Sequence, residues 1–222
     1  MFRRLLPFAG FLLILGAVSC AGNTGTGPTT VTTVAATGSS TTLVVTTSTA
    51  TPTAGELPPI VVPTLPAKIP AYGQVDPATG LHVTGTPEVI DVVSYRLKVD
   101  GKVDHPLSLS YDDLRRLPKV TATATLVCPA TFTDITTWSG VPLETILDMA
   151  GVQPGATKIT MKAADGYYDS LALGDALKPE NFLAYEWEGQ PLPVLHGFPL
   201  RAVLPGQPGG FWVKWLLEIV VE

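Results

Sequence analysis

Residues 119–128, KVTATATLVC, alternate between polar and apolar side chains in the way that a half-buried β-strand does. The strand predicted from this pattern ends at Cys128, and we expect a polar loop after the proline that follows it. Side chains at such strand-to-loop junctions often bind ligands or react. The position therefore raises the question of what a single thiol does there.

Further strands are predicted on both sides of this one. Residues 91–110 contain two strand-like runs joined at Asp100-Gly101, a dipeptide typical of hairpin turns. Turns between strands are also expected at Asp165-Gly166 and Glu188-Gly189. The segments that we expect to form the remaining strands are residues 157–173, 181–193, 200–205 and 212–222.

Only two short helices are predicted. Ser110 and Asp113 have the spacing of a capping box, and Pro118 ends the helix that they begin. Pro142 suits the first turn of a second helix, and Gly151 suits its C-terminal cap. The expected fold class is therefore α+β, a strand-rich mixed sheet or barrel domain with short helices as connectors.

The first 20 residues have the features of a bacterial lipoprotein signal peptide. Two arginines precede an apolar run of signal-peptide length, and small residues then lead to Cys20, which would carry the lipid. An uncleaved anchor or a plain cleaved signal is the alternative. We therefore expect an exported protein that is lipid-anchored to the outer face of the bacterial cytoplasmic membrane, in the cell envelope.

Residues 21–84 are expected to form a disordered tether rich in threonine and proline. No Asp, Glu, Lys or Arg occurs between Leu5 and Gly55, and few large apolar side chains follow Cys20. Such a composition cannot offset the entropy lost on folding. Residues 85–222 remain as one domain. The formal net charge of −5 argues against a nucleic-acid partner.

On the residues alone, four roles are open for Cys128. A buried core thiol is ordinary in general, but an unpaired thiol is unusual in an oxidising compartment. A redox thiol would need a second cysteine, and the chain has only Cys20 besides. A nucleophile would need a base such as His196. A ligand to a transition metal would need further ligands from a cofactor, because one thiolate cannot hold the metal alone.

Three basic residues gather in a glycine-rich part of the C-terminal third. Singly, each of His196, Arg201 and Lys214 is better explained by a surface or structural role. Together they favour a bound anion such as a phosphorylated cofactor, because glycine-rich turns expose backbone N–H groups and arginine binds phosphate through a planar fork. The glycines lie at positions 197, 206, 209 and 210.

Two blocks of the sequence resemble a known family. In residues 125–147, TLVCPATFTDITTWSGVPLETIL, a strand-end cysteine precedes a tryptophan and GVPL. The second block begins with DGYYDSLAL at Asp165 and continues through LAY, HGFPLR, PG and VKWL. From about Tyr95 to the C-terminus the chain is thus similar to the molybdopterin-binding domain of the sulfite oxidase group. That group also includes plant nitrate reductase and a bacterial periplasmic methionine sulfoxide reductase.

This resemblance implies a molybdenum–molybdopterin cofactor and a binding role for five residues. Cys128 corresponds to the catalytic thiolate bound to molybdenum, and the pterin dithiolene would supply two more sulfurs. His196, Arg201 and Lys214 correspond to residues that hold the pterin and its phosphate. Gly209 corresponds to a glycine of the cofactor-binding loop.

The resemblance assigns four further residues to the surroundings of the metal. Tyr167 corresponds to the catalytic tyrosine near the metal, and Ser170 stands beside it among the cofactor-binding residues. Trp138 and Gly140 would shape the wall of the pocket.

Several positions depart from the family pattern. Sulfite oxidases carry arginines soon after the cysteine and before VKWL, but here residues 129–134 contain no cation and Phe211 occupies the second position. Leu195 stands where an acidic residue is expected before HG. Burying an anion without paired cations is costly. We therefore expect a small-molecule substrate other than sulfite.

The function predicted is that of an extracytoplasmic oxidoreductase that moves an oxygen atom or two electrons at molybdenum. The sequence contains no haem-attachment motif of the form C-x-x-C-H. A separate electron-transfer protein or membrane redox partner is therefore expected. The alternative is a redox-inactive binding module that keeps the same fold.

Overall fold

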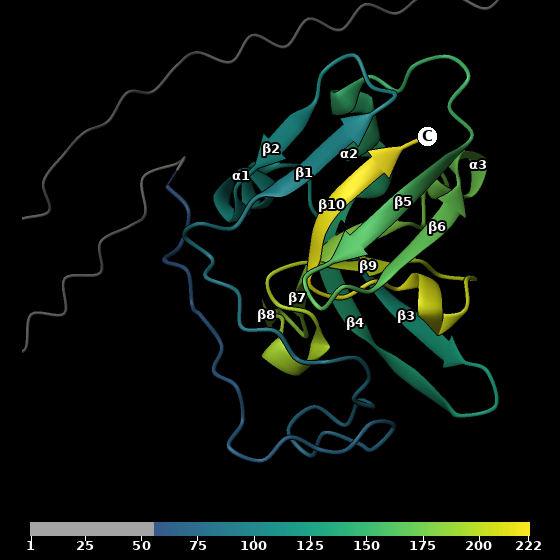
Figure 1. Cartoon of the computed structure of the whole chain (residues 1–222). Coiled ribbons are helices and arrows are strands. Elements are labelled where there is room, and N and C mark those ends of the chain that lie inside the picture. Colours follow the sequence, from purple (N-terminus) through teal and green to yellow (C-terminus); the bar gives the residue numbers. More distant parts are fainter. Residues whose placement is uncertain (1–55) are drawn as a thin grey trace, which may run out of the picture. The chain divides into compact units, whose positions relative to one another are not determined.

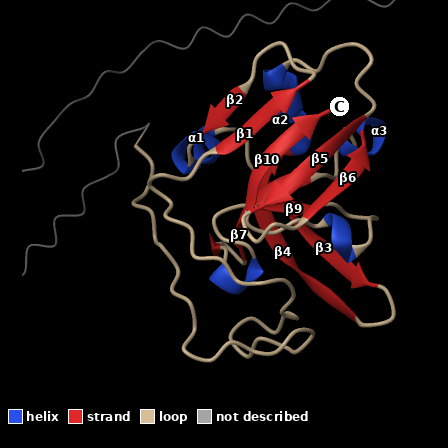
Figure 2. Cartoon of the chain, in the orientation of Figure 1, coloured by secondary structure: helices blue, strands red, loops and turns tan. Residues whose placement is uncertain are grey.

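The computed structural model describes residues 56–222, so the predicted signal peptide and the lipidation site at Cys20 lie outside the described residues. The described part of the chain forms two β-sheets with short helices between strands (Figure 1, Figure 2). The first sheet has the order β2-β1-β10-β5-β6, and β1 and β10 are its parallel pair. Its strands are β1 (Leu97–Gly101), β2 (Leu107–Leu109), β5 (Lys158–Ala163), β6 (Tyr168–Ala172) and β10 (Leu216–Val221).

The second sheet is antiparallel and carries the stretch around Cys128. In it, β3 and β4 form a long hairpin, β4 also pairs with β7, and both β8 and β9 pair with β7. The hairpin register runs from Val120 opposite Gly140 to Cys128 opposite Phe132, which places the thiol at the last paired position before the turn. The strands are β3 (Val120–Cys128), β4 (Phe132–Pro142), β7 (Phe182–Trp187), β8 (Gln190–Pro191) and β9 (Arg201–Val203).

The strand β4 corrects the expectation of a polar loop after Cys128. Its buried positions include Asp134 and Thr136, whereas Ile135 between them is 66% exposed. The usual alternation is thus reversed over these residues, because the inward face carries polar side chains. A reading based on hydrophobic periodicity therefore misses the strand.

The helices are short connectors, as expected. In α1 (Tyr111–Arg116), the side chains of Ser110 and Asp113 form both hydrogen bonds of the predicted capping box. In α2 (Leu143–Ala150), Gly151 ends the helix in a left-handed conformation, but Pro142 lies just before the helix and not in its first turn. The others are α3 (Leu173–Ala176) and two 3₁₀ turns, η1 (Val194–His196) and η2 (Gly209–Phe211).

Two strand boundaries differ from the prediction. The chain does not turn at Asp100-Gly101, because β1 continues through both residues and pairs with Val220 and Val221 of β10. A Cβ atom at position 101 would lie 2.2 Å from the Val221 carbonyl oxygen, so this glycine is needed for close strand contact. The last strand begins at Leu216, after a loop over residues 212–215.

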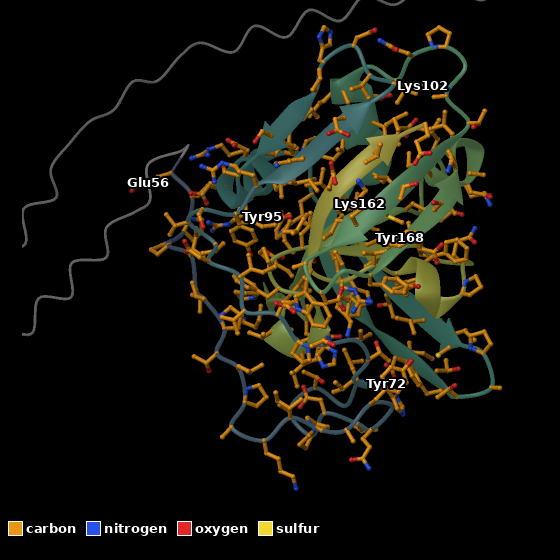
Figure 3. All side chains as sticks on the ribbon, viewed as in Figure 1. Glu56, Tyr72, Tyr95, Lys102, Lys162 and Tyr168 are labelled. Atoms are coloured by element: carbon orange, nitrogen blue, oxygen red, sulfur yellow. The ribbon has the colours of Figure 1, made fainter. Side chains whose placement is uncertain are left out.

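The core is one continuous cluster of apolar side chains to which both sheets contribute. The side chains between the ribbons in Figure 3 fill this region. Its fully enclosed members include Leu97 and Ile159 from the first sheet, Phe182 and Leu183 from the second, and Ile146 from α2. The expected strand-rich α+β fold is confirmed.

The packed unit begins before residue 85, which corrects the expected extent of the tether. Leu81 is 5% exposed and Val83 is 2% exposed, and Val75 and His82 form a β-bridge. We call residues 71–84 the N-terminal segment. Residues 56–70, which precede it, are mostly exposed and contain no helix or strand. Within the described range, the structure contains no helix with the length and apolar character needed to cross a membrane.

Candidate active site

A cavity of about 250 Å³ opens between the β3–β4 hairpin, the N-terminal segment and the loops of the last 30 residues. It is lined by six of the residues singled out from the sequence for catalysis or cofactor binding, which come from distant parts of the chain. These are Cys128, Tyr167, His196, Arg201, Gly209 and Lys214.

The glycine loop lies directly against the end of β3. Val127 forms a parallel β-bridge with Pro208. A Cβ atom at Gly209 would lie 3.0 Å from Leu126 Cδ2 and 3.2 Å from the Val127 carbonyl oxygen. This close packing places Gly209 beside the half-buried Cys128 at the wall of the cavity.

Arg201 is a buried cation at the start of β9. It is 3% exposed, and its Nη1 donates a hydrogen bond to the His196 carbonyl oxygen at 3.1 Å. Its guanidinium carbon lies 4.5 Å from the centre of the Trp138 ring and 5.8 Å from that of Trp212. Arg201 forms no ion pair within residues 56–222, and burial lowers its pKa to about 9.

Lys214 lies in the loop before β10. Its ammonium group donates hydrogen bonds to the carbonyl oxygens of Thr84 and Leu195, the second at 3.2 Å. It also lies 4.4 Å from the centre of the Trp215 ring. The loss of hydration, together with repulsion from Arg201, lowers the pKa of Lys214 to about 7. Like Arg201, it has no carboxylate partner in the described part of the chain.

His196 is held by the N-terminal segment. Its Nε2 lies 2.9 Å from Thr79 Oγ1 and 3.1 Å from Asp76 Oδ2. Burial lowers the pKa of His196 to about 4, and the charges of Arg201 and Lys214 act in the same direction and outweigh Asp76. The ring is therefore neutral at pH 7.

Tyr167 borders the cavity from the turn between β5 and β6. Its side chain is 45% exposed, and its hydroxyl donates a hydrogen bond to the Gly210 carbonyl oxygen at 3.2 Å. Burial and the neighbouring Asp169 carboxylate raise the pKa of this phenol. Tyr167 is thus a protonated phenol at the edge of the cavity over the physiological pH range.

Two residues assigned by resemblance do not line the cavity. The hydroxyl of Ser170 on β6 lies 2.8 Å from that of Thr160 on β5. Gly140 permits close contact between β4 and β7, since a Cβ atom there would lie 1.9 Å from the Leu183 carbonyl oxygen. Trp138, in contrast, does border the cavity as expected.

One wall of the cavity contains residues that sequence reasoning missed. His82 Nδ1 lies 2.7 Å from Asp134 Oδ1, and the His82 backbone N–H donates to the other carboxylate oxygen at 2.9 Å. The His82 ring stacks on Phe132, with the ring centres 4.2 Å apart and the planes at 7°. All three line the cavity, together with Tyr72. No signal in the sequence indicated that residues 71–84 pack against β4.

The donors around the cavity fit an anionic, hydrogen-bonding ligand. Two cations without carboxylate partners are costly to keep in a protein interior unless a ligand balances their charge. The indole N–H of Trp138 is also buried and has no hydrogen-bond partner in residues 56–222. These groups would hold a phosphorylated cofactor, while Cys128 would supply a thiolate to its metal.

The comparisons with known proteins agree with this site. Residues 83–222 match the family described as the oxidoreductase molybdopterin binding domain, and the chain belongs to this family. It is therefore a molybdopterin-dependent oxidoreductase domain, and its cofactor is molybdenum–molybdopterin. The resemblance to the sulfite oxidase group is thus confirmed.

Curated relatives include bacterial and animal proteins. The chain is 35% identical over 142 residues to the uncharacterized oxidoreductase YuiH of Bacillus subtilis, over 63% of this chain and 71% of that protein. It is 33% identical over 132 residues to a putative protein-methionine-sulfoxide reductase subunit, YedZ1, of Azospira oryzae, over 60% of this chain and 50% of that one. It is 35% identical over 163 residues to the mitochondrial sulfite oxidase of Homo sapiens, over 60% of this chain and 30% of that one.

A solved structure shows a similar fold. The sulfane dehydrogenase SoxCD from Paracoccus pantotrophus superimposes with a TM-score of 0.58 and 28% identity, over 61% of this chain and 40% of the other. The chain spans about half the length of the Azospira relative and less than a third of the human sulfite oxidase. The similarity therefore concerns the cofactor-binding domain that these proteins share.

Proposed function

We propose that this protein is an extracytoplasmic oxidoreductase in which Cys128 is the thiolate ligand of molybdenum. His196, Arg201 and Lys214 would hold the organic part of the cofactor. When bound, molybdenum–molybdopterin supplies two-electron redox chemistry, including oxygen-atom transfer. The single observation that carries the proposal is that Cys128 borders the same cavity as two cations that have no carboxylate partner in residues 56–222.

Each neighbouring residue has a part in this proposal. Arg201 offers a planar set of donors and Lys214 a compact charge, a combination suited to a phosphate group. Trp138 and Trp212 cover the guanidinium and keep water from it. The raised pKa keeps Tyr167 protonated, and because its hydrogen is donated to the Gly210 carbonyl oxygen, its hydroxyl can accept a hydrogen bond at the cavity edge.

The wall next to Cys128 supports a substrate other than sulfite. It presents the paired His82 and Asp134 and the ring of Phe132, where sulfite oxidases are expected to carry arginine. A carboxylate and aromatic rings favour a neutral substrate over a small dianion, because a second anion here would lack a cation of its own. The Azospira relative, described as a putative protein-methionine-sulfoxide reductase subunit, makes a neutral sulfoxide the first substrate class to test.

The electron partner and the location form part of the same proposal. Each turnover at molybdenum moves two electrons, and the sequence contains no haem-attachment motif of the form C-x-x-C-H, so the proposal includes a separate redox protein. The N-terminal arginines, the apolar run and Cys20 support export and a lipid anchor in the cell envelope. The partner would then be an electron-transfer protein outside the cytoplasm or a membrane redox protein.

Metal analysis tests the proposal. The full chain, produced in a host that makes the cofactor, is expected to carry about one molybdenum per chain, and Cys128→Ser is expected to lose it. Val127→Ser is the matched control, because it places the same hydroxyl one residue away on an exposed part of β3. A folded wild-type protein without molybdenum would support the redox-inactive binding module instead.

The substrate is tested on the molybdenum-loaded protein. Electron transfer would be followed with sulfite as reductant and, separately, with a panel of sulfoxides and N-oxides as oxidants. We expect turnover with at least one neutral oxidant and none with sulfite. Sulfite-dependent reduction of an electron acceptor would refute the assignment of substrate class while leaving the cofactor assignment intact.

A further inference from the structure

The three groups around the His196 ring nitrogen Nε2 determine which ring nitrogen carries the hydrogen. Asp76 is 4% exposed and accepts hydrogen bonds from the Ala78 backbone N–H at 3.0 Å and from Thr79 Oγ1 at 3.1 Å. Thr79 Oγ1 in turn accepts from the Leu81 backbone N–H at 3.2 Å. His196 Nε2 lies within hydrogen-bond distance of both side chains.

Only one placement of the hydrogens on Asp76, Thr79 and His196 gives every close contact a donor and an acceptor. An ionised carboxylate is an acceptor only, and a hydroxyl has a single hydrogen, which Thr79 gives to Asp76. If Nε2 of His196 carried a lone pair, it would face the lone pairs of the carboxylate at 3.1 Å. With a hydrogen on Nε2, the ring donates to Asp76 and Thr79, and every partner is satisfied.

The protonation states agree with this count. Burial raises the pKa of Asp76, but the hydrogen bonds from Ala78, His196 and Thr79 outweigh it, so the pKa is lowered and the carboxyl is ionised at neutral pH. His196 is neutral, as described above. A neutral ring with its hydrogen on Nε2 has a bare lone pair on Nδ1.

The contacts with Asp76 and Thr79 occupy Nε2, which leaves Nδ1 as the ring nitrogen available to the cavity that His196 lines. Nδ1 has no hydrogen-bond partner among residues 56–222, yet it is not one of the fully enclosed side-chain atoms that lack a partner, which are Trp138 Nε1 and Asn181 Oδ1. It is therefore the atom through which this cavity-lining residue can meet a ligand.

We propose that Asp76 and Thr79 are positioning residues that fix His196 as the Nε2–H tautomer and turn the Nδ1 lone pair toward the cavity. His196 then accepts a hydrogen bond from an N–H group of the bound cofactor, and Arg201 and Lys214 alone take its anionic part. The identity of the donor rests on the proposed function. The tautomer does not, because it follows from contacts within the chain.

This assignment extends the site beyond the region that matches the family. The matching residues begin at 83, whereas Asp76 and Thr79 precede that point. Residues expected to lie in a disordered tether thus orient a cofactor-binding side chain. The N-terminal segment also supplies the Thr84 carbonyl oxygen that receives the Lys214 ammonium group.

The first test reads the tautomer directly and needs no cofactor. Imidazole ¹⁵N chemical shifts are recorded on the cofactor-free full chain labelled at its three histidines, and His196→Gln identifies the signals of His196. Wild type is expected to show the Nε2–H tautomer. In Asp76→Asn, whose amide can donate as well as accept, we expect a mixture of tautomers or the Nδ1–H form. An Nδ1–H ring in wild type, or no change in Asp76→Asn, would overturn the proposal.

The matched control is Asp91→Asn. Asp91 accepts from the Val93 backbone N–H at 3.1 Å and from Ser94 Oγ at 2.7 Å, the same local pattern as Asp76, but it contacts no histidine. Its variant is expected to leave the His196 signals unchanged. If Asp76→Asn does not fold, the Thr79 pair carries the test: Thr79→Val should broaden or shift the signals, and Thr79→Ser should restore them.

The second test measures cofactor retention. In protein loaded with cofactor, Asp76→Asn is expected to release molybdenum on the order of tenfold faster than wild type, since a hydrogen bond to a charged group is lost. Asp91→Asn is expected to match wild type. Equal release from all three proteins would refute the positioning role. A wild type that never binds molybdenum would instead refute the proposed function and leave the tautomer result standing.

Discussion

The Arg201 guanidinium carbon lies 4.5 Å from the centre of the Trp138 ring. Its shortest hydrogen bond, at 3.1 Å, is to an uncharged acceptor, the His196 carbonyl oxygen. A cation–π contact and one carbonyl compensate only part of the lost hydration of a buried cation. The site is therefore arranged for its ligand at the expense of the stability of the ligand-free protein.

This relationship predicts opposite effects of Arg201→Met on stability and on cofactor binding. The free energy of unfolding of the cofactor-free protein should stay within about 1 kcal/mol of wild type or rise, because an unpaired buried cation is replaced by an apolar side chain. The same variant should lose most of its molybdenum. Denaturant unfolding and metal analysis measure the two effects.

The control for this substitution is Arg115→Met. Arg115 also lies over an aromatic ring, that of Tyr111 at 5.8 Å, but it pairs with Asp112 at 2.9 Å and does not line the cavity. It should keep its molybdenum. A loss of several kcal/mol in cofactor-free Arg201→Met would show that Arg201 is instead a structural residue.

The lowered pKa of Lys214 predicts a pH dependence of stability. The pKa of Lys214 is about 7 in the folded state, whereas in the unfolded chain it has the ordinary value of 10.5. Above pH 7 the unfolded state thus binds more protons, so the stability of the cofactor-free protein should rise with pH. The slope approaches at most about 1.4 kcal/mol per pH unit.

Denaturant unfolding between pH 7 and 8 measures this slope, because Arg201, with a pKa of about 9, contributes little there. Lys214→Met should remove the rise. Bound cofactor should also reduce it, because a phosphate group near Lys214 would favour the charged form. An equal slope in wild type and Lys214→Met would contradict the assignment of the effect to this residue.

Local sequence patterns predicted most of the fold because strand alternation, helix caps and tight turns depend on residues that are close together in the sequence. The alternation in residues 119–128 becomes β3, and Ser110 caps α1 with the expected partner. Glu188 and Gly189 adopt φ angles of 46° and 74° in the turn between β7 and β8. At Gly101, however, the same residue type serves close contact with β10, which no local pattern distinguishes from a turn.

Several residues that line the cavity could be singled out from the sequence because their type is unusual at their position. Cys128, Arg201 and Lys214 were found because a strand-end thiol and cations among glycines are unusual. Asp76 and Thr79 were missed because they directly follow a proline-rich stretch, which indicates a spacer and not a short packed segment. Their role depends on contacts with His196, which lies 120 positions after Asp76 and 117 positions after Thr79 in the sequence.

The close packing of Gly209 predicts a specific effect of Gly209→Ala. The added methyl group would lie 3.0 Å from Leu126 Cδ2 and 3.2 Å from the Val127 carbonyl oxygen, so the glycine loop must move by a few tenths of an ångström. We expect a loss of about 1 kcal/mol in stability and faster molybdenum release. Gly174→Ala is the control, since nothing lies within 4 Å of its added methyl group. Equal molybdenum release from the two variants would show that the loop tolerates the shift.

The packing of the N-terminal segment predicts where truncation begins to matter. Residues 56–70 are mostly exposed, so removal of residues 1–70 should change the free energy of unfolding by no more than about 1 kcal/mol. Removal of residues 1–84 also takes away the buried side chains of Leu81 and Val83, each of which stabilises the fold by about 1.5–3 kcal/mol. It removes the Asp76 and Thr79 contacts with His196 as well. Thermal and denaturant unfolding should therefore show that the two truncated proteins differ in stability by several kcal/mol. Only the protein that lacks residues 1–84 should lose its molybdenum. If the protein that begins at residue 85 were as stable as the one that begins at residue 71 and kept its molybdenum, the segment would be a tether after all.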